Sequence, residues 1–349
     1  MIRRLSAVLL LLALGGCAGM PLRTGVTPRP AKMDFVVIGD TPYDAVDETM
    51  LATAVPMVKA LNPPFVLHVG DTQSGGEICG EAADARTRKL FADLQPIPVF
   101  YAVGDNEWTD CDRKIDPTSA KPFSELQRLD LIRHMFFSRP AVTAAAWNYL
   151  QQPDMPENAR FDYGGLTFVT LNVVGTNNGR DFVKGDDLAV AGRAADARDV
   201  HDVDWLKAAF DHARLVKAQG VVIVMQADMT GNTKPEARGI LCTDVAVDDT
   251  RVCDGFLSIR KALIDQAAAY GKPVVFIHGD TSPYTLWRGI EGQDTGNLWE
   301  LNAAGDAGVK NGVLHGVRDV THVWIDLSSP QPVRAEGLTT GVKPDGAHP

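Results

Sequence analysis

Aspartates recur at the ends of the most apolar segments of this 349-residue chain. Carboxylates that gather without a counter-charge repel one another, and their pKa values rise. A bound cation relieves this repulsion, because buried charges in proteins are paired or coordinate metals. The alternative is that Gly-Asp is ordinary turn chemistry at strand ends. Four such pairs in one chain favour a cation site. The five segment-ending aspartates, of which all but the fourth follow a glycine, are Asp40, Asp71, Asp105, Asp228 and Asp280.

The segments that carry these aspartates have the composition of buried strands, being short and rich in Val, Ile and Phe. Amphipathic stretches between them predict helices over residues 48–61, 82–94, 124–137, 204–218 and 257–270. This alternation indicates a layered α/β fold, in which ligands bind outside the carboxyl ends of the strands. The predicted strands lie in DFVVIGD, FVLHVGD, PVFYAVGD, LTFVTLNVVG, VVIVMQAD, VVFIHGD and THVWIDL.

No linker divides the chain after residue 32, so we predict a single domain over residues 33–338. The Pro- and Arg-containing stretch 17–32 is interpreted as an extended linker. Residues 339–349 are expected to form a disordered tail.

The motifs GDTPY, HVGD, GDNEWTDC and HGDT, in this order, resemble the calcineurin-like metallophosphoesterase family, which includes the purple acid phosphatases. The likeness runs from Met33 to about Leu327, and GDNEWTDC is its most specific part. Taken together, the four motifs are most similar to a subgroup of exported bacterial proteins. The resemblance implies a two-sheet α/β sandwich (αββα) with a dinuclear metal site at the strand ends.

Matched one position at a time, the resemblance implies metal ligands that are all oxygen donors. Asp40 matches the family's first metal-binding Asp, and Asp71 matches the carboxylate that bridges its two metals. Asp105 stands at the family's metal-binding Asn, Gln226 at its strand-end His, and Asp280 at the first His of its last motif. Because carboxylate and amide oxygens suit hard cations, we expect one or two Mg²⁺, Mn²⁺ or Ca²⁺ ions rather than Zn²⁺ or Fe.

The family's proton donor is also replaced. Family members protonate the leaving group with a His, while the metals activate water. Asn106 occupies this position and can donate a hydrogen bond to a phosphoryl oxygen, but an amide cannot act as an acid. Glu107 is expected to orient Asn106. His278 and His68 are the alternative proton donors, unless they are core histidines bonded to backbone.

Two further segments near the predicted strand ends carry side chains that suit ligand binding. Tyr43 flanks the first Gly-Asp, where it could stack on a ligand or pack at the rim of the site. In LNVVGTNNG, either Asn177 or Asn178 presents its amide to a ligand, or the segment is a turn of residues that tolerate left-handed backbone.

The sequence therefore supports two functions. The first is a metal-dependent phosphoesterase of the bacterial cell envelope that hydrolyses a phosphomonoester or phosphodiester on a small molecule or envelope component. The second is a catalytically impaired relative that binds a ligand or a protein partner. The chain has 44 acidic and 34 basic residues. This acidic excess argues against nucleic acid as a partner, because phosphate contacts need the opposite charge.

Four cysteines besides Cys17 can pair in three ways. Cys242 and Cys253 bracket one polar segment, which favours a local disulfide and leaves Cys79 to pair with Cys111. No pair has C-x-x-C spacing, so a thiolate zinc site is not expected. Disulfides would indicate an oxidising compartment.

The first 16 residues have the pattern of an export signal. Arg3 and Arg4 precede the apolar run 7–14, which is too short to span a bilayer. The run leads into Leu14-Gly15-Gly16-Cys17, which looks like a bacterial lipobox. We expect acylation of Cys17 to anchor the protein at the periplasmic face of the cell envelope. Ala18, the next residue, favours the outer membrane. A signal peptide that is simply cleaved is the alternative.

Acylation can be tested by expressing the full chain with radiolabelled fatty acid. Wild type should incorporate label and sediment with membranes, because the lipobox places Cys17 where processing needs it. Cys17→Ala should incorporate none. Equal labelling of the two proteins, or a wild type found entirely in the soluble fraction, would contradict the lipobox assignment.

Overall fold

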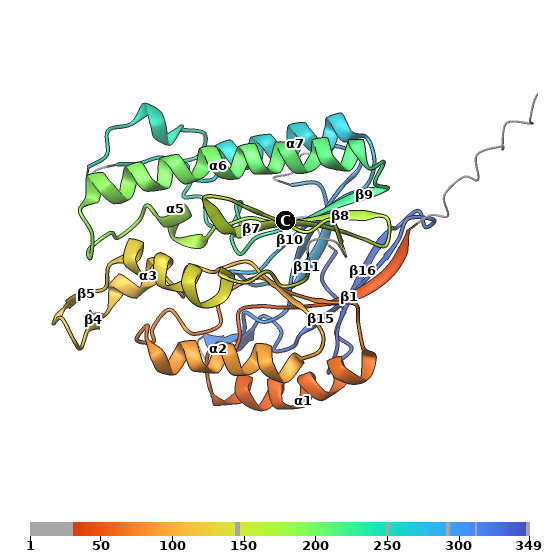
Figure 1. The fold of residues 1–349 in the computed structure, drawn as a ribbon, viewed down its shortest axis with the longest axis horizontal. Helices are drawn as coiled ribbons and strands as arrows, with labels where there is room; N and C mark the ends of the chain where they lie inside the picture. The colour runs from red at the N-terminus through yellow and green to blue at the C-terminus, as the bar shows by residue number, and fades with distance from the viewer. Residues whose placement is uncertain (1–30, 144–146, 249–250, 291–293, 311–312, 347–349) are drawn as a thin grey trace, which may run out of the picture.

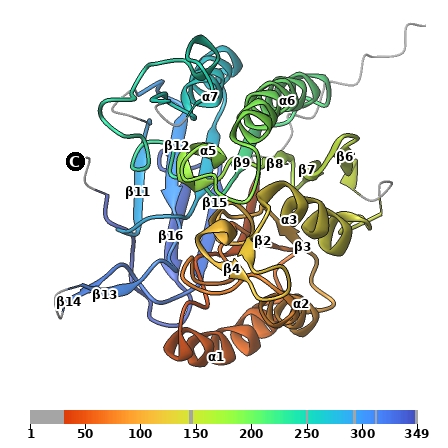
Figure 2. The same cartoon turned by 90° about the vertical axis from the view of Figure 1, so that its left-hand side faces the viewer.

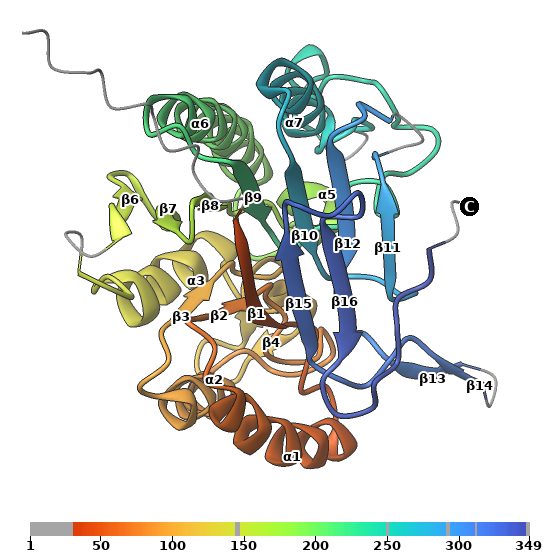
Figure 3. The same cartoon turned by 90° about the vertical axis from the view of Figure 1, so that its right-hand side faces the viewer.

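Two β-sheets face each other in the computed structural model, which describes residues 31–143, 147–248, 251–290, 294–310 and 313–346 (Figures 1 and 3). In the first sheet β1, β2 and β3 run parallel, and β15 and β16 continue it antiparallel beyond β1. Its order is β16 (Val333–Gly337), β15 (Thr321–Asp326), β1 (Lys32–Ile38), β2 (Val66–His68) and β3 (Val99–Tyr101).

The second sheet has a parallel centre of β12, β10, β9 and β8, with antiparallel strands at both edges. The central strands are buried on both faces, which explains their near-continuous apolar sequence. Its order is β11 (Thr285–Arg288), β12 (Leu298–Asn302), β10 (Val274–His278), β9 (Gly220–Val224), β8 (Leu166–Thr170), β7 (Met155–Tyr163) and β6 (Leu150–Gln152).

Aromatic side chains fill the space between the sheets. Phe65 from the loop before β2 stacks on Phe35 with ring centroids 5.4 Å apart, and it meets Phe168 of β8 edge-on at 5.0 Å. Phe161 of β7 stacks on Phe168 at 4.9 Å. All four rings are fully buried, and offset or edge-on pairs of this kind are favoured beyond the area that they bury.

Helices cover the outer face of each sheet and complete four layers (Figures 1 and 2). Leu51 and Leu90 belong to the helices that pack on the first sheet, α1 and α2. Phe210 and Leu263 belong to those that pack on the second, α6 and α7. The bounds are α1 (Ala45–Leu61), α2 (Glu81–Leu94), α6 (Leu188–Leu215) and α7 (Leu257–Tyr270).

Shorter elements lie in the loops between the layers and at their margins. They are the 3-10 helices η1 (Thr109–Arg113) and η3 (Cys242–Asp244), helix α3 (Glu125–Ile132) with its π-helical extension η2 (Arg133–Phe137), the turn α5 (Gly175–Gly179), and the hairpins β4–β5 (Ile115–Asp116, Lys121–Pro122) and β13–β14 (Gly308–Lys310, Val313–His315).

The predicted α/β sandwich is confirmed, with differences in several elements. All seven predicted strands form, and α7 has the predicted bounds. The prediction over 204–218 was too short, because α6 begins at Leu188, where the Asp187 carboxylate accepts the N–H of Val190 at 2.9 Å. The segment 124–137 is helical, but its last turn is a π-helix.

The ends of the domain also differ from the prediction. Ala31 is buried and Lys32 already belongs to β1, so the linker ends earlier than expected. The prediction of a disordered tail is wrong for residues 339–346. Asp345 exchanges backbone hydrogen bonds of 2.9 Å with Tyr284 and Leu286, and the N–H of Thr340 binds the Asp319 carboxylate. Residues 1–30, which include Cys17, lie outside the described part of the chain.

Both predicted disulfides are confirmed. Cys79 pairs with Cys111, and Cys242 pairs with Cys253, with Cα separations of 5.5 and 4.9 Å. Two disulfides fit the expected oxidising compartment. Among the described residues, no helix has both the length and the apolar character needed to cross a membrane.

Candidate metal centre

The carboxyl ends of the parallel strands of both sheets meet at one edge of the sandwich, which faces the viewer in Figure 2. Residues that follow strands of different sheets bond directly here. The N–H of Asp280, after β10, donates to Asp40 Oδ1, after β1, at 2.7 Å. Gln226, after β9, donates its Nε2 to Asp105 at 2.9 Å and to Asp71 at 3.3 Å. The predicted convergence of these five residues is therefore present.

Three of the predicted ligands can reach one ion. Asp71, Asp105 and Asp280 each offer a carboxylate oxygen, and these oxygens lie within 4.8 Å of one another. A cation with oxygen ligands at about 2.0–2.6 Å can contact all three. Asp40 lies beside this group, and its Oδ2 is buried without a hydrogen-bond partner in the described structure. Buried polar atoms are normally satisfied, so the donor set fits a bound cation.

The aspartates themselves take the turn that ends each strand. Asp40, Asp71 and Asp280 have φ of 53°, 55° and 75°, in the left-handed region that only Gly, Asn and Asp visit readily. Of the glycines that precede these aspartates, Gly70 also lies in the left-handed region (φ 88°). At Gly104 and Gly279 glycine is needed for lack of space. A Cβ would collide there with the carboxylates of Asp71 and Asp40, respectively.

Burial and mutual repulsion oppose ionisation of these carboxyl groups. Burial raises the pKa of Asp71 well above its ordinary value, and the charge of Asp105 raises it further. The pKa of Asp280 is raised well above normal by the same two causes. Burial also raises the pKa of Asp105, and burial together with the charge of Asp306 raises that of Asp40. A cation would reverse this by stabilising the ionised forms.

Glu107 does not orient Asn106 as expected. Its carboxylate instead accepts the backbone N–H groups of Thr72, Asp71 (3.1 Å) and Gly104 (2.8 Å), together with the Thr72 hydroxyl at 2.7 Å. Glu107 therefore holds the loops after β2 and β3 together. The difference arises because the backbone of both loops points its N–H groups inward at this one acidic side chain.

Asn106 does lie at the centre, where its N–H donates to Asp71 Oδ1 at 3.3 Å. Its side-chain amide points to the Tyr43 hydroxyl at 3.5 Å. That hydroxyl in turn contacts Asp71 Oδ2 at 3.0 Å and Asp40 Oδ1 at 3.3 Å. Tyr43 thus packs at the rim and bridges two predicted ligands. Its position near the first Gly-Asp in the sequence did not indicate this bridging role.

Gln226 is placed as predicted, but it offers a different atom. Its Oε1 accepts the N–H of Gly175 at 2.7 Å, which fixes the amide and turns its NH₂ group toward Asp71 and Asp105. Flipping the amide would set its oxygen against two carboxylates and its NH₂ against an N–H donor. In this structure Gln226 is therefore a hydrogen-bond donor to the carboxylates and not an oxygen ligand.

His278, predicted as a proton donor, is bonded to groups outside the Asp71, Asp105 and Asp280 cluster. It is buried, its Nδ1 bonds the Gly279 carbonyl at 2.9 Å, and its Nε2 lies 3.5 Å from Glu300. Burial lowers the pKa of His278, but the Glu300 hydrogen bond and nearby charges outweigh this and raise it to about 9. Asp228 joins His278 and Glu300 in a separate group and does not join Asp71, Asp105 and Asp280.

His68 is a core histidine. Its side chain is fully buried, the Gly70 N–H donates to its Nδ1 at 3.2 Å, and its ring meets Phe91 and Tyr101 edge-on. Burial lowers the pKa of His68 to about 3, so the ring is neutral. In the described structure, both histidines are buried and bonded to groups other than Asp71, Asp105 and Asp280.

Thr176 is a site residue that the sequence did not indicate. Its hydroxyl contacts Asp105 Oδ2 at 2.9 Å and Asp110 Oδ1 at 2.7 Å. A hydroxyl has one hydrogen to donate, so the second contact needs a proton from a carboxyl group. Burial, with the charge of Asp105, raises the pKa of Asp110 to about 7, and its other oxygen pairs with Arg113.

Comparison with known proteins adds no relative from which a role could be transferred: no protein-family model matches the chain, and no curated protein matches it in sequence.

The role of Glu107 can be tested by Glu107→Gln. The amide keeps one oxygen but turns an NH₂ group toward backbone donors, so the free energy of unfolding should fall by about 1–3 kcal/mol. Urea unfolding of the mature domain, residues 18–349 without signal peptide and lipidated Cys17, measures this free energy. Glu77→Gln, which breaks a half-exposed pair with Arg86, is the matched control and should change it by less than about 1 kcal/mol. Equal effects of the two variants would contradict the role assigned to Glu107.

The raised carboxyl pKa values predict the pH dependence of the metal-free protein. Because the folded state holds the Asp71 proton more tightly than the unfolded chain (pKa 3.8), Asp71 loses stabilising effect as pH rises above that value. The free energy of unfolding of wild type relative to Asp71→Asn should therefore fall as pH rises above about 4, by at most about 1.4 kcal/mol per pH unit. Urea unfolding in the presence of a chelator tests this, and a difference that rises with pH would refute it.

Proposed function

We propose that this chain is a metal-dependent phosphoesterase of the bacterial cell envelope, with an oxygen-rich metal site at the strand ends. The observation that carries the proposal is the approach of Asp71, Asp105 and Asp280 to within 4.8 Å, beside the unpartnered Oδ2 of Asp40. The resemblance of GDNEWTDC and the other strand-end motifs to calcineurin-like metallophosphoesterases supports the same reading.

The donor set favours Mg²⁺, Mn²⁺ or Ca²⁺ over Zn²⁺ or Fe, because the grouped side chains offer carboxylate oxygens and no imidazole. Asp71 would hold the ion from the middle of the group, since it contacts Gln226, Tyr43 and the N–H of Asn106. Four ionised carboxylates carry four negative charges, and one divalent ion neutralises two of them. The site therefore has charge enough for one or two ions.

The bound cation would polarise a phosphoryl oxygen and lower the pKa of a coordinated water. The chain's own contribution is to orient the substrate. Asn106 and Tyr43 border the carboxylates and would donate hydrogen bonds to phosphoryl oxygens. Burial and the charge of Asp71 raise the pKa of Tyr43 well above 10, so its hydroxyl keeps its proton.

The same contacts limit the substrates. Because His278 and His68 are both withdrawn into bonded, buried positions, we expect neither imidazole to protonate a leaving group. Esters of acidic alcohols, such as aryl phosphates, need no such proton. The proposed substrate is therefore a phosphorylated small molecule or envelope component with a good leaving group.

The burial of both histidines also favours the second reading, a phosphoesterase-like scaffold that binds a ligand or protein without turnover. In either case we place the protein in the cell envelope, with acylated Cys17 as its contact with the outer membrane. The export pattern and the two disulfides support this location.

Metal binding should stabilise the mature domain by mass action, by about 2.7 kcal/mol at a hundredfold excess over the dissociation constant. Mg²⁺, Mn²⁺ or Ca²⁺ should raise the melting temperature more than Zn²⁺, and Asp71→Asn should abolish the shift. Asp202→Asn is the matched control, because Asp202 is equally buried, has a raised pKa and lies on α6 away from the strand ends. It should keep the shift.

A chromogenic aryl phosphate assay with the same ions separates the two functions. Turnover by wild type that is lost in Asp71→Asn supports the phosphoesterase. A metal-dependent thermal shift without turnover supports the scaffold. No shift with any of the ions would remove the basis of the metal site itself.

A further inference from the structure

The turn α5, which follows β8, has unusual backbone geometry. Thr176, Asn177 and Asn178 each have φ of 54°, three consecutive residues in the left-handed region. Asn tolerates this conformation, as expected from the sequence, but a β-branched residue such as Thr176 does not adopt it without help. Such backbone persists only where surrounding contacts over-determine it.

On one side the turn is bound to the candidate metal centre. The Gly175 N–H donates to Gln226 at 2.7 Å, and the Thr176 hydroxyl contacts Asp105 at 2.9 Å. A Cβ at Gly175 would collide with Asp105 and lie 2.8 Å from Asp280 Oδ2, so the backbone itself forms one wall of the site.

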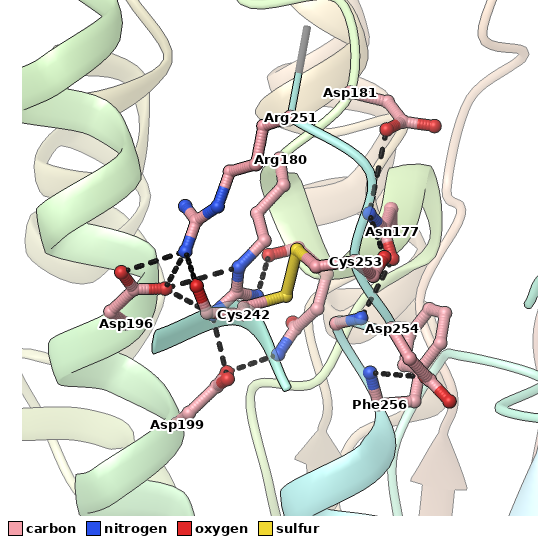
Figure 4. Close-up of a disulfide and its surroundings, with 12 residues drawn as sticks. Asn177, Arg180, Asp181, Asp196, Asp199, Cys242, Arg251, Cys253, Asp254 and Phe256 are labelled. Atoms are coloured by element: carbon pink, nitrogen blue, oxygen red, sulfur yellow. Dashed lines mark hydrogen bonds and ion pairs between the residues drawn. A yellow bond between two sulfur atoms is a disulfide. The ribbon is translucent and has the colours of Figure 1, made fainter. Parts of the chain in front are cut away.

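On the other side the turn is bound through Asn177 to a separate loop (Figure 4). Its Nδ2 donates to the Cys253 carbonyl at 3.0 Å, and its Oδ1 accepts the Gly255 N–H at 2.8 Å. Both polar atoms of the amide are therefore used by backbone groups 76 and 78 residues away. This rules out the sequence-based alternative in which Asn177 presents its amide to a ligand.

The described ends of the loop that receives Asn177 are bonded to neighbouring elements. The disulfide joins Cys253 to Cys242 across 11 residues. Arg251 bonds the Cys242 carbonyl at 2.6 Å and Asp196 of α6 at 2.9 Å (Figure 4). Asp254 forms a buried ion pair with Arg260 of α7 at 2.5 Å. The loop is thus anchored to both helices that cover the second sheet.

We propose that Asn177 is a positioning residue of the candidate metal centre: it ties the left-handed turn to the disulfide-closed loop and so holds the Thr176 hydroxyl on Asp105. The inference rests on the proposed function, because it concerns the same cation. A partner that orients a ligand carboxylate commonly changes metal affinity by about 10–100-fold when it is lost. The disulfide contributes by holding the carbonyl that Asn177 binds.

Asn177→Gly tests the tie directly, because glycine keeps the left-handed backbone and removes both hydrogen bonds. Asn62→Gly is the matched control, since Asn62 is also left-handed (φ 52°) but is exposed at the end of α1. A Cys242→Ser/Cys253→Ser double variant tests the anchor. Each mature domain is examined by hydrogen–deuterium exchange without metal and by Mn²⁺ titration in a calorimeter, after cooperative urea unfolding has confirmed that it folds.

Asn177→Gly should speed exchange at the Arg180 and Asp181 amides, which bond the Thr176 carbonyl, and should weaken Mn²⁺ binding at least about tenfold. The double variant should change both in the same direction, and Asn62→Gly should change neither. Faster exchange with unchanged affinity would make Asn177 merely structural and overturn the proposal. If the double variant shows unchanged exchange and unchanged Mn²⁺ affinity, the proposed contribution of the disulfide is wrong.

The titration of wild type separates this inference from the proposed function. If wild type binds Mn²⁺ and Asn177→Gly binds it equally well, the positioning role is wrong and the metal site stands. If wild type binds no divalent ion, the metal site is wrong, and the positioning role falls with it.

Discussion

Four aspartate carboxylates share one buried edge of the sandwich, and their repulsion is the constraint on which the surrounding structure depends. Each aspartate turns sharply off the end of its strand, which brings carboxylates from both sheets together. Neutral hydrogen-bond donors then bind these carboxylates. Tyr43 reaches Asp40 and Asp71, Gln226 reaches Asp71 and Asp105, and Thr176 reaches Asp105. These contacts orient the carboxylates without contributing a positive charge.

The backbone meets the same constraint by close approach. Side chains at Gly104, Gly175 or Gly279 would collide with the clustered carboxylates, so glycine is required where the loops pass the site. The left-handed conformations of Asp40, Asp71 and Asp280 add strain of about 1–3 kcal/mol each. Glu107 offsets part of it by accepting N–H groups from both the β2 and the β3 loop. Strain concentrated in this way is common at ligand sites.

Whether a structural element could be predicted from the sequence depends on how far apart in the chain the interacting residues lie. Strands buried on both faces, helix α7 and the local disulfide pairing could be predicted, because each depends on residues close in sequence. Strand β7, with the mixed sequence MPENARFDY, could not, since its alternation is set by the neighbours that it meets in the sheet. The start of α6 depends on a single cap at Asp187.

For the site, residue identity was predictable and atomic role was not. The five predicted ligand positions converge, with Gln226 and not Asp228 as the fifth, but what each side chain does is decided by partners far away in the chain. Gln226 is turned by Gly175, 51 residues earlier, and Glu107 is captured by the loop around Thr72, 35 residues earlier. His278 is held by Glu300 across a pair of strands. No local pattern contains these contacts.

The placement of a neutral amide at Gln226 completes the electrostatic argument. Gln226 lies between two carboxylates, the position from which a lysine or a protonated histidine would neutralise them internally and compete with any cation. An amide donates the same hydrogen bonds without contributing charge. It therefore keeps Asp71 and Asp105 oriented without adding a positive charge that would compete with a cation. Neutral donors that orient a group of carboxylates favour a cation over an anion as its ligand, and this preference does not depend on whether the protein catalyses hydrolysis.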